Sequence, residues 1–359
     1  MSAIASRVED LQAGVRAAPR LLPRGAGTKP ALSIAPDGVT SLDVSGLSGI
    51  LEHDPGELTF TALAGTPVAE VAAALAEHGQ YLPFDPPLTE AGATLGGVVA
   101  AGTSGPGALR HGGIRDFVIG VRFIDGTGRL ITGGGKVVKN AAGFDLPKLM
   151  VGSAGRLGVL VQVSLKVFPR PQATTTVRAG FDSVQEAVGV MARLGRGPVE
   201  LDALDLEPPG TLVIRLGGAR DTLGARALRL ERALGTACER IDGDAEADYW
   251  RGVGELNWAP TGSGVVRVAM APRGIPGLSS ALADAGARFR YSLAGNLAWV
   301  AWPGDRPIGD LDRALRSLEL AGMVLWGAAD RPLVGRLSGG AFATRIRAAL
   351  DPDTRFLEY

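Results

Sequence analysis

The sequence contains little cysteine and little histidine, and charge of neither sign is in excess. Its 359 residues include one cysteine, Cys238, three histidines, 37 basic residues and 37 acidic residues. A single cysteine excludes a disulfide within the chain, an iron–sulfur cluster held by the chain alone and a zinc site built from thiolates. Balanced charge provides no long-range attraction for nucleic acid or for an anionic membrane surface. We therefore expect no metal site and no nucleic acid partner, and any iron–sulfur centre should lie on another chain.

Long apolar runs are also absent. No run reaches the roughly 18 apolar residues of a membrane-spanning helix, and residues 1–20 lack the apolar core of a secretory signal. We expect the chain to be cytoplasmic, with attachment to the inner face of the membrane only through partner subunits. Its length and its 46% of hydrophobic residues favour two domains with sizeable cores.

Glycine, in contrast, is abundant and unevenly placed. The chain has 52 glycines, about twice the usual share of ~7%. The first half is predicted to begin with short strands, and a helix is predicted from Thr66 and Pro67 to the stop at Gly79. An ordered, aperiodic loop, a hairpin and a last strand follow. The strands are predicted at 31–35, 41–44 and 58–64, the loop at 81–113, the hairpin at 117–124 and 129–132, and the last strand at 157–168.

A proline pair, Pro169 and Pro171, marks the predicted domain boundary because the sequence changes character beyond it. Ser183 and Glu186 form a capping box for a helix that should run to residue 194. Further helices and strands are predicted at 211–216, 220–234, 265–270, 297–302 and 311–320. No internal repeat is visible. The predicted fold class is α+β, with a first domain at 1–170 and a smaller α+β C-terminal domain at 171–359.

Three glycine-rich segments are candidates for ligand binding. In the first, at 23–29, backbone amides of a tight turn could cradle phosphate oxygens, although an exposed basic turn is an equal alternative. The second, at 94–107, offers small residues against which a flat or anionic ligand could lie, or it is a buried packing run. The third spans 139–146 and continues to 158.

Two common nucleotide motifs do not match the first segment. A Rossmann fingerprint needs a third glycine that opens a helix, whereas Pro30 and a predicted strand follow here. A P-loop needs lysine and then serine or threonine after the second glycine, whereas Gly27 is followed by Thr28, Lys29 and Pro30.

The order and spacing of these segments resemble the FAD-binding domain of the vanillyl-alcohol oxidase and p-cresol methylhydroxylase family. The resemblance covers 21–170. It rests on an R-G-x-G-T turn at 24–28, a T-x-G-G loop at 94–97, an R-D-x-V-x-G strand at 115–120 and a G-S-x-G-x-L-G turn at 152–158. It implies a first domain of two subdomains, FAD as the cofactor and a C-terminal domain that acts as a cap or binds partners. The FAD-binding residues that it implies are Arg24, Gly25, Ala26, Gly27, Thr28, Thr94, Leu95, Gly96, Gly97, Gly102, Ser104, Gly105, Arg115, Asp116, Val118, Gly152, Gly158, Val159 and Val161.

Finer details resemble the branch of this family that supplies FAD-binding subunits to bacterial glycolate oxidases. These details are the segments 51–58, 82–87 and 139–146 and the run Tyr249-Trp250-Arg251. The likeness implies a complex that also has a catalytic flavin subunit and an iron–sulfur subunit and that oxidises glycolate to glyoxylate. The sequence departs from the family at Ala26, at Ala154, where catalytic relatives have an acidic residue, and in its C-terminal ending at 351–356.

The chain is poor in groups that could serve as the catalytic base. Oxidation of a 2-hydroxy acid needs a base for the hydroxyl proton, and histidine suits this role at neutral pH. The resemblance places catalytic histidines in the second domain, whereas His53, His78 and His111 all precede it. We therefore expect a non-catalytic or electron-relaying partner subunit and leave the catalytic residues unassigned. His111 is expected to contact FAD non-covalently or not at all.

Two other functions remain open. A stand-alone FAD-dependent 2-hydroxy acid dehydrogenase could use Tyr249 or Tyr291 as its base and one of three arginines for the substrate carboxylate. Residues of these types are more often ordinary packing or surface residues, and that alternative stays open for each of them. A scaffold subunit could have kept the fold and lost the flavin. The three arginines are Arg251, Arg267 and Arg288, and five tryptophans of the second domain, Trp250, Trp258, Trp299, Trp302 and Trp326, could form a subunit interface or a core.

Overall fold

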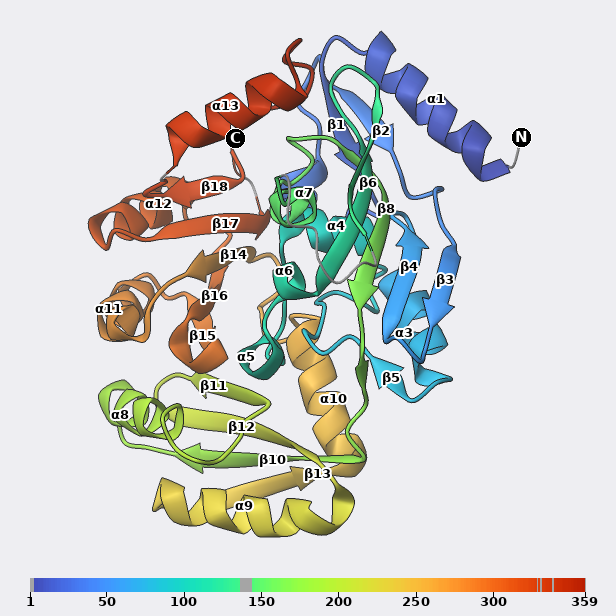
Figure 1. The fold of residues 1–359 in the computed structure, drawn as a ribbon. Coiled ribbons are helices and arrows are strands. Elements are labelled where there is room, and N and C mark those ends of the chain that lie inside the picture. Colours follow the sequence, from blue (N-terminus) through green and yellow to red (C-terminus); the bar gives the residue numbers. More distant parts are fainter. Residues whose placement is uncertain (1–2, 136–143, 328, 330, 338, 359) are drawn as a thin grey trace. The chain divides into compact units, whose positions relative to one another are not determined.

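The chain folds into two compact units. The computed structural model, shown in Figure 1, describes residues 3–135, 144–327, 329, 331–337 and 339–358. Unit 1 consists of Met1–Ser104, Gly112–Pro169 and Ser338–Tyr359, and unit 2 consists of Gly105–His111 and Arg170–Leu337. Both helices and strands occur in each unit, and the predicted α+β class is confirmed.

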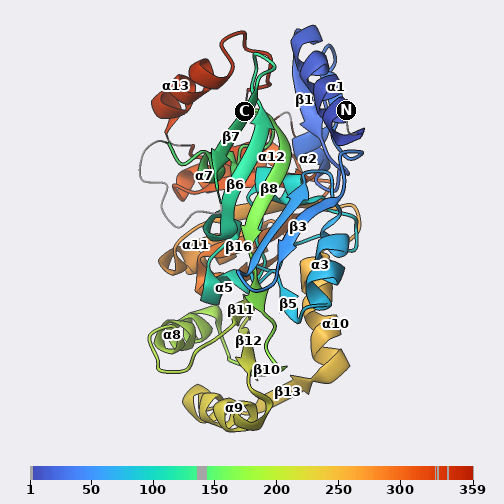
Figure 2. The same ribbon diagram turned by 45° about the vertical axis from the view of Figure 1, so that its right-hand side comes forward.

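The larger part of unit 1 is a five-stranded antiparallel sheet in the order β3-β4-β8-β6-β7 (Figures 1 and 2). The predicted hairpin is confirmed, since Ile124 pairs with Leu130 across the turn that begins at Asp125. The strands are β3 (Ile50–Asp54), β4 (Thr59–Leu63), β6 (Val118–Ile124), β7 (Leu130–Gly134) and β8 (Val159–Lys166), with a short pair formed by β5 (Gln80–Tyr81) and β9 (Phe168–Pro169). The helices of this part are α3 (Val68–Ala76), α4 (Leu95–Ala101), α6 (Ile114–Phe117) and α7 (Leu146–Met150).

The smaller part of unit 1 contains a parallel strand pair and two helices. It consists of α1 (Ala3–Ala17), β1 (Leu21–Arg24), α2 (Pro30–Ser33) and β2 (Thr40–Asp43), with β1 paired to β2. The strand predicted at 31–35 is wrong, because these residues begin in α2. Pro30 occupies the first turn of this helix, where its missing N–H group is tolerated, and it starts the helix directly after the glycine turn.

The segment predicted as an aperiodic loop also contains helices. Within 81–113, α4 is capped at its start by the Thr94 side chain and ends at Gly102, whose φ of 61° lies in the left-handed region. The residues of α4 are almost all buried, so its sequence lacks the apolar and polar alternation that marks a surface helix. This is why the periodicity of the sequence missed it.

Unit 2 is built on a nine-stranded sheet in the order β13-β10-β12-β11-β15-β16-β14-β17-β18. Although the sequence shows no repeat, the element order strand-helix-strand-strand-helix-strand occurs twice, and the two halves meet where Leu206 pairs with Tyr291. The first half is β10 (Ala173–Gly180), α8 (Val184–Leu194), β11 (Ala203–Glu207), β12 (Thr211–Gly218), α9 (Arg220–Leu234) and β13 (Cys238–Asp242). The second half is β14 (Gly264–Ala269), α11 (Ile275–Asp284), β15 (Arg288–Ser292), β16 (Leu297–Trp302), α12 (Ile308–Ser317) and β17 (Ala321–Trp326), followed by β18 (Leu333–Gly335).

Helices cover both faces of this sheet. Helix α10 (Gly243–Gly254) packs on one face, where Trp250 Nε1 donates a hydrogen bond to Thr176 Oγ1 over 2.7 Å. Helix α11 packs on the other face, where the hydroxyl groups of Ser279 and Tyr291 are 2.7 Å apart. Successive side chains along a strand point to opposite faces of the sheet, so they contact different helices. This applies to the tyrosines and arginines described below.

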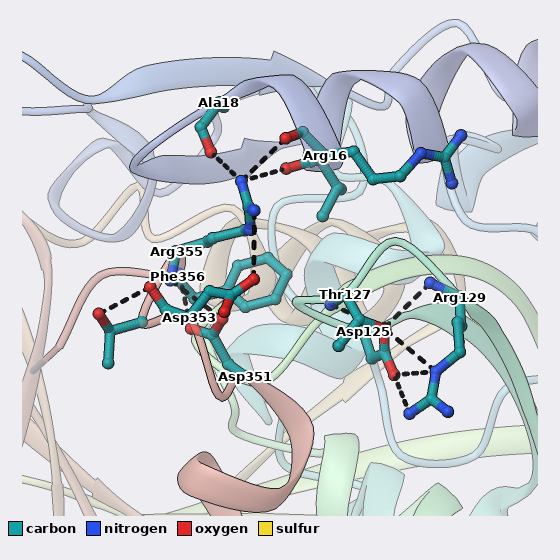
Figure 3. A network of polar contacts seen from close by, with 11 residues as sticks. Arg16, Ala18, Asp125, Thr127, Arg129, Asp351, Asp353, Arg355 and Phe356 are labelled. Carbon is teal, nitrogen blue, oxygen red and sulfur yellow. Dashed lines mark hydrogen bonds and ion pairs between the residues drawn. The ribbon is translucent and has the colours of Figure 1, made fainter.

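The division of the chain differs from the predicted domains at two places. The boundary lies between Pro169 and Arg170, but 338–359 return to unit 1 with α13 (Gly340–Leu350). This return is fixed by Arg355, whose guanidinium donates to the carbonyl oxygens of Arg16 and Ala18 at 2.9 and 2.8 Å (Figure 3). The buried carboxylate of Asp351 accepts the N–H groups of Arg355 and Phe356.

The second difference concerns the short helix α5 (Ala108–His111), which belongs to unit 2 although it interrupts the sequence of unit 1. Its Arg110 forms ion pairs with Asp202 at 2.5 Å and Glu200 at 2.9 Å. Such a long-range contact has no signature in the local sequence. Among the described residues, no helix combines the length and apolarity that crossing a membrane requires.

Candidate functional site

Glycine-rich segments that lie far apart in the sequence line one cavity of unit 1. The cavity has about 680 Å³ of space between its walls, part of it open to solvent. Its lining residues are Pro23, Arg24, Gly25, Ala26, Gly27, Thr28, Lys29, Leu32, Ser33, Val44, Ala64, Thr94, Gly96, Gly97, Ala100, Ala101, Ala154, Gly155, Gly158 and Leu160.

The first wall is the glycine turn between β1 and α2. Gly27 has a φ of 74°, and a Cβ atom there would lie 2.9 Å from the Arg24 guanidinium. Both the backbone conformation and the close side chain favour glycine at this position. The turn is held to β2 by the N–H group of Val44, which donates to the carbonyl oxygen of Arg24 at 2.8 Å.

The second wall is the N-terminal end of α4. Thr94 Oγ1 accepts a hydrogen bond from the N–H group of Gly97 at 3.3 Å, as expected of an N-cap threonine. A Cβ atom on Gly25 would lie 2.5 Å from the same oxygen, so the glycine turn and the start of α4 are in direct contact. Gly96 is equally crowded, since a Cβ atom there would lie 2.9 Å from the carbonyl oxygen of Ala64.

The third wall is the turn that precedes β8. Ala154 and Gly155 have φ values of 46° and 74°, and a Cβ atom on Gly155 would lie 3.1 Å from Cδ of Pro23. Gly158 has a φ of 155° and is pressed against Phe123 and the carbonyl oxygen of Ile124. Close contacts between backbones therefore explain why small residues occur in all three walls.

The charge of the lining suits an anion. Arg24 and Lys29 are its charged residues, and no aspartate or glutamate is among the lining residues. Threonine and serine hydroxyl groups at Thr28 and Ser33 add hydrogen-bonding capacity. Two cations, exposed glycine amides and an apolar remainder fit the diphosphate and the flat rings of a dinucleotide.

Nine of the residues implied by the family resemblance are brought together in this cavity, and the others lie outside its lining. The nine are Arg24, Gly25, Ala26, Gly27, Thr28, Thr94, Gly96, Gly97 and Gly158. The others are Leu95, Gly102, Ser104, Gly105, Arg115, Asp116, Val118, Gly152, Val159 and Val161. Several of these have structural contacts instead: Ser104 Oγ accepts the N–H group of Ile114 at 2.9 Å, and Arg115 donates to the carbonyl oxygen of Lys148 at 2.7 Å.

Some lining residues were not among those implied by the family motifs. Ala100 and Ala101 belong to the small-residue run that the sequence displays, and Lys29 ends the glycine turn. Val44, Ala64 and Leu160 belong to ordinary apolar stretches that carry no local signal. Of the third glycine-rich segment, 139–143 lie outside the described residues.

The histidines of unit 1 have structural contacts. His53 Nε2 lies 2.8 Å from Gln80 Oε1, and its ring packs edge-on against Phe60 and His78. His111, in α5, belongs to unit 2. None of the three lines the cavity described above.

The two candidate tyrosines are held inside unit 2 as hydrogen-bonded phenols. Tyr249 donates to Glu207 Oε1 at 2.8 Å and accepts from Arg290 at 3.3 Å, and burial raises the pKa of its phenol far above the ordinary value. Burial raises the pKa of Tyr291 to about 12. Neither phenol would ionise near neutral pH, which argues against both as catalytic bases.

The three candidate arginines differ in their surroundings. Arg251 pairs with Asp248 at 2.5 Å on the surface, and Arg288 is exposed. Arg267 lies on β14 opposite Trp299 of β16, and its Nε is buried without a hydrogen-bond partner among the described residues. Burial lowers the pKa of the Arg267 guanidinium, and no described carboxylate offsets this effect.

The tryptophans are divided between core and partly exposed positions. Trp250, Trp299 and Trp302 are at most 8% exposed and contribute to the core of unit 2, whereas Trp258 and Trp326 are partly exposed. Among the described residues, no three histidine, cysteine or acidic side chains gather as a metal site would require.

Comparisons with known proteins point to the same part of the chain. The "FAD binding domain" family model matches residues 2–134. Glycolate oxidase subunit GlcE of Escherichia coli is 43% identical over 205 residues, which are 57% of this chain and 58% of that protein. Glycolate oxidase subunit GlcD of Bacillus subtilis is 31% identical over 196 residues, which are 54% of this chain and 42% of that protein. The matches thus span about half the length of these relatives.

A solved structure of an alkyldihydroxyacetonephosphate synthase has a similar fold. It superimposes on 97% of this chain and 74% of its own, with a TM-score of 0.70 and 17% sequence identity. At this identity the likeness concerns the fold alone, and it agrees with the expected family fold. Residues 2–134 therefore match the FAD binding domain family, and the cofactor is FAD.

Proposed function

We propose that this chain is the FAD-binding subunit of a complex that oxidises glycolate to glyoxylate. The observation that carries the proposal is the convergence of three glycine-rich walls on one cationic cavity, two of them in the segment that matches the FAD binding domain. The similarity to a glycolate oxidase subunit supports glycolate, or a related small 2-hydroxy acid, as the substrate.

The residues of the cavity fit the cofactor. Arg24, Lys29 and the amides around Gly25 and Gly27 would hold the diphosphate, and Thr28 would add a hydroxyl group. The Thr94 side chain fixes the start of α4 at this point and so keeps the Gly97 amide in place. When bound, FAD supplies a two-electron acceptor for the hydroxy acid.

In the proposed complex, this chain is the partner of a separate catalytic subunit. The phenols of Tyr249 and Tyr291 remain protonated at neutral pH, and His53 and His78 are engaged in a structural cluster with Phe60 and Gln80. Proton abstraction would then fall to a catalytic flavin subunit, and an iron–sulfur subunit would carry the electrons onward. A complex of this composition agrees with the single cysteine, which leaves this chain unable to hold a cluster by itself.

The purified chain is expected to be yellow and nearly inactive alone. Its visible spectrum should show bound flavin, whereas glycolate-dependent dye reduction should be at least ~100-fold lower than for the co-purified complex. Spectroscopy of the chain with and without its partner subunits measures both. A colourless chain that does not take up added FAD would support the scaffold alternative, and turnover at the rate of the complex would exclude the partner role.

A second candidate, a stand-alone 2-hydroxy acid dehydrogenase, is favoured by one observation. Arg267 has a buried Nε and no described counter-charge, and a buried cation without a partner is unfavourable unless an anion joins it. A substrate carboxylate would be such an anion.

If Arg267 receives a carboxylate, the variant Arg267→Met should bind oxalate at least tenfold more weakly than the unmodified chain. Titration calorimetry with oxalate measures this directly. Arg288→Met is the matched control, because Arg288 is exposed on strand β15 of the same sheet and should not affect affinity. Equal affinity in all three proteins would remove the support for this second function.

A further inference from the structure

A buried arginine joins two walls of the dinucleotide cavity. Arg156 lies in the turn before β8 and is 3% exposed. Its Nη1 atom donates a hydrogen bond to the carbonyl oxygen of Leu32 at 3.0 Å and another, very short one to the carbonyl oxygen of Ala154. Both Leu32 and Ala154 line the cavity, whereas Arg156 itself lies behind the lining.

The two carbonyl groups belong to different parts of unit 1. Leu32 is in α2, directly after the glycine turn of the smaller part, and Ala154 is in the turn that leads into the five-stranded sheet. Gly155 meets Pro23 at the same junction, where an added Cβ atom would come within 3.1 Å of the proline ring. The Arg156 side chain therefore links these two walls by hydrogen bonds.

The chemistry of arginine is suited to this position. One guanidinium presents several N–H groups in a fixed plane, so it can hold two carbonyl oxygens at once, and it remains protonated at any physiological pH. Two of its hydrogen bonds go to neutral backbone carbonyl groups, one in each of the two walls.

We propose that Arg156 is a positioning residue for the dinucleotide: its guanidinium ties the α2 wall of the cavity to the wall formed by the turn before β8. This inference rests on the proposed FAD site. It assigns to Arg156 a role in affinity for the anionic cofactor and no contact with the reacting atoms.

Replacement of Arg156 separates this role from a general contribution to folding. In Arg156→Met, FAD affinity should fall at least tenfold, because no side chain then joins the α2 wall to the turn before β8. Arg156→Lys can donate to only part of this pair of carbonyl groups in the same geometry, so its affinity should lie between those of Arg156→Met and the unmodified chain. Flavin fluorescence quenching measures the dissociation constants, and ADP serves as a second probe that carries the diphosphate without the flavin.

A matched control is available in the same unit. Arg355 also donates to backbone carbonyl groups, those of Arg16 and Ala18, but it does not line the cavity or contact residues that do so in its side-chain hydrogen bonds (Figure 3). Arg355→Met should lower the melting temperature of the flavin-free protein while leaving FAD affinity within about twofold.

Three results of these binding and stability measurements would lead to different conclusions. If the unmodified chain binds FAD and both Arg156 variants bind it equally well, the Arg156 proposal is wrong and the proposed function stands. If Arg156→Met loses stability only, as Arg355→Met does, the side chain is merely structural and the proposal is again wrong. If the unmodified chain binds neither FAD nor ADP, the FAD site and the role of Arg156 are both overturned.

Discussion

The variant Gly96→Ala is expected to lose at least tenfold in FAD affinity and to purify largely without flavin. Gly96 is buried in α4, and its N–H group donates to the carbonyl oxygen of Ala64 at 2.7 Å. An added methyl group would lie 2.7 Å from Ala64 Cβ and 2.9 Å from Ala64 O, distances that no side-chain rotation relieves. The start of α4 must then move away from the end of β4, which distorts one wall of the cavity, and overpacking of this kind costs about 1–3 kcal/mol.

Flavin content per protein and the FAD dissociation constant measure this effect. The control is Gly224→Ala, which makes the same change in the exposed face of α9, where an added Cβ meets no atom within 4 Å. This control should retain its flavin and gain about 0.5–1 kcal/mol of stability, because alanine is the better helix former. Full flavin content in Gly96→Ala would show that the start of α4 does not contribute to the site.

Replacement of Arg290 by methionine is expected to reduce the free energy of unfolding by about 3–5 kcal/mol, since it removes one partner of a buried ion pair. Arg290 and Asp205 are 3% and 0% exposed and lie 3.0 Å apart, and Glu207 lies 3.3 Å from the same guanidinium. Burial acts to lower the pKa of Arg290, but Asp205, Tyr249 and Glu207 more than offset it, so the arginine is firmly charged in the native protein.

The loss of unfolding free energy in Arg290→Met should depend on pH. Burial is the strongest influence on the Asp205 carboxyl and raises its pKa, and without Arg290 no cation opposes this effect. A folded-state pKa above the unfolded value means that the folded state holds the proton more tightly, so stability is greatest at low pH and declines as pH rises through the folded-state pKa. The difference from the unmodified chain should therefore shrink as pH is lowered.

Denaturant unfolding at several pH values measures this prediction. Arg313→Met is the control, because Arg313 pairs with Asp310 on the surface of α12, where the two side chains are 75% and 37% exposed. An exposed pair contributes less than about 1 kcal/mol. Equal losses in the two variants would contradict a special role for the buried pair at the junction of the two halves of the sheet.

Local sequence patterns predicted an element correctly where the residues themselves favour the backbone conformation that the element requires. The hairpin around Asp125 was predictable because its turn residues favour a tight reversal, and α9 was predictable from its helix-forming composition and the glycine at its end. The glycine turn at 24–28 and the small residues at 94–97 were recognisable because their function requires backbone without bulky side chains.

Other features had no local signal. A fully buried helix such as α4 lacks amphipathic periodicity, and a four-residue helix such as α2 is too short to show any. The topological repeat in unit 2 depends on the order of elements and is compatible with unrelated side chains.

The sequence by itself determined the match of residues 2–134 to the FAD binding domain family, the glycine-rich turns of the candidate site and the small number of histidines, because these are properties of residue identity and close spacing. Only the tertiary structure decided that Gly25, Gly97 and Gly158 share one cavity, that Arg156 spans two of its walls and that 338–359 return to unit 1. These features arise from contacts between residues tens to hundreds of positions apart, and such contacts are settled by packing of the whole unit rather than by any local preference.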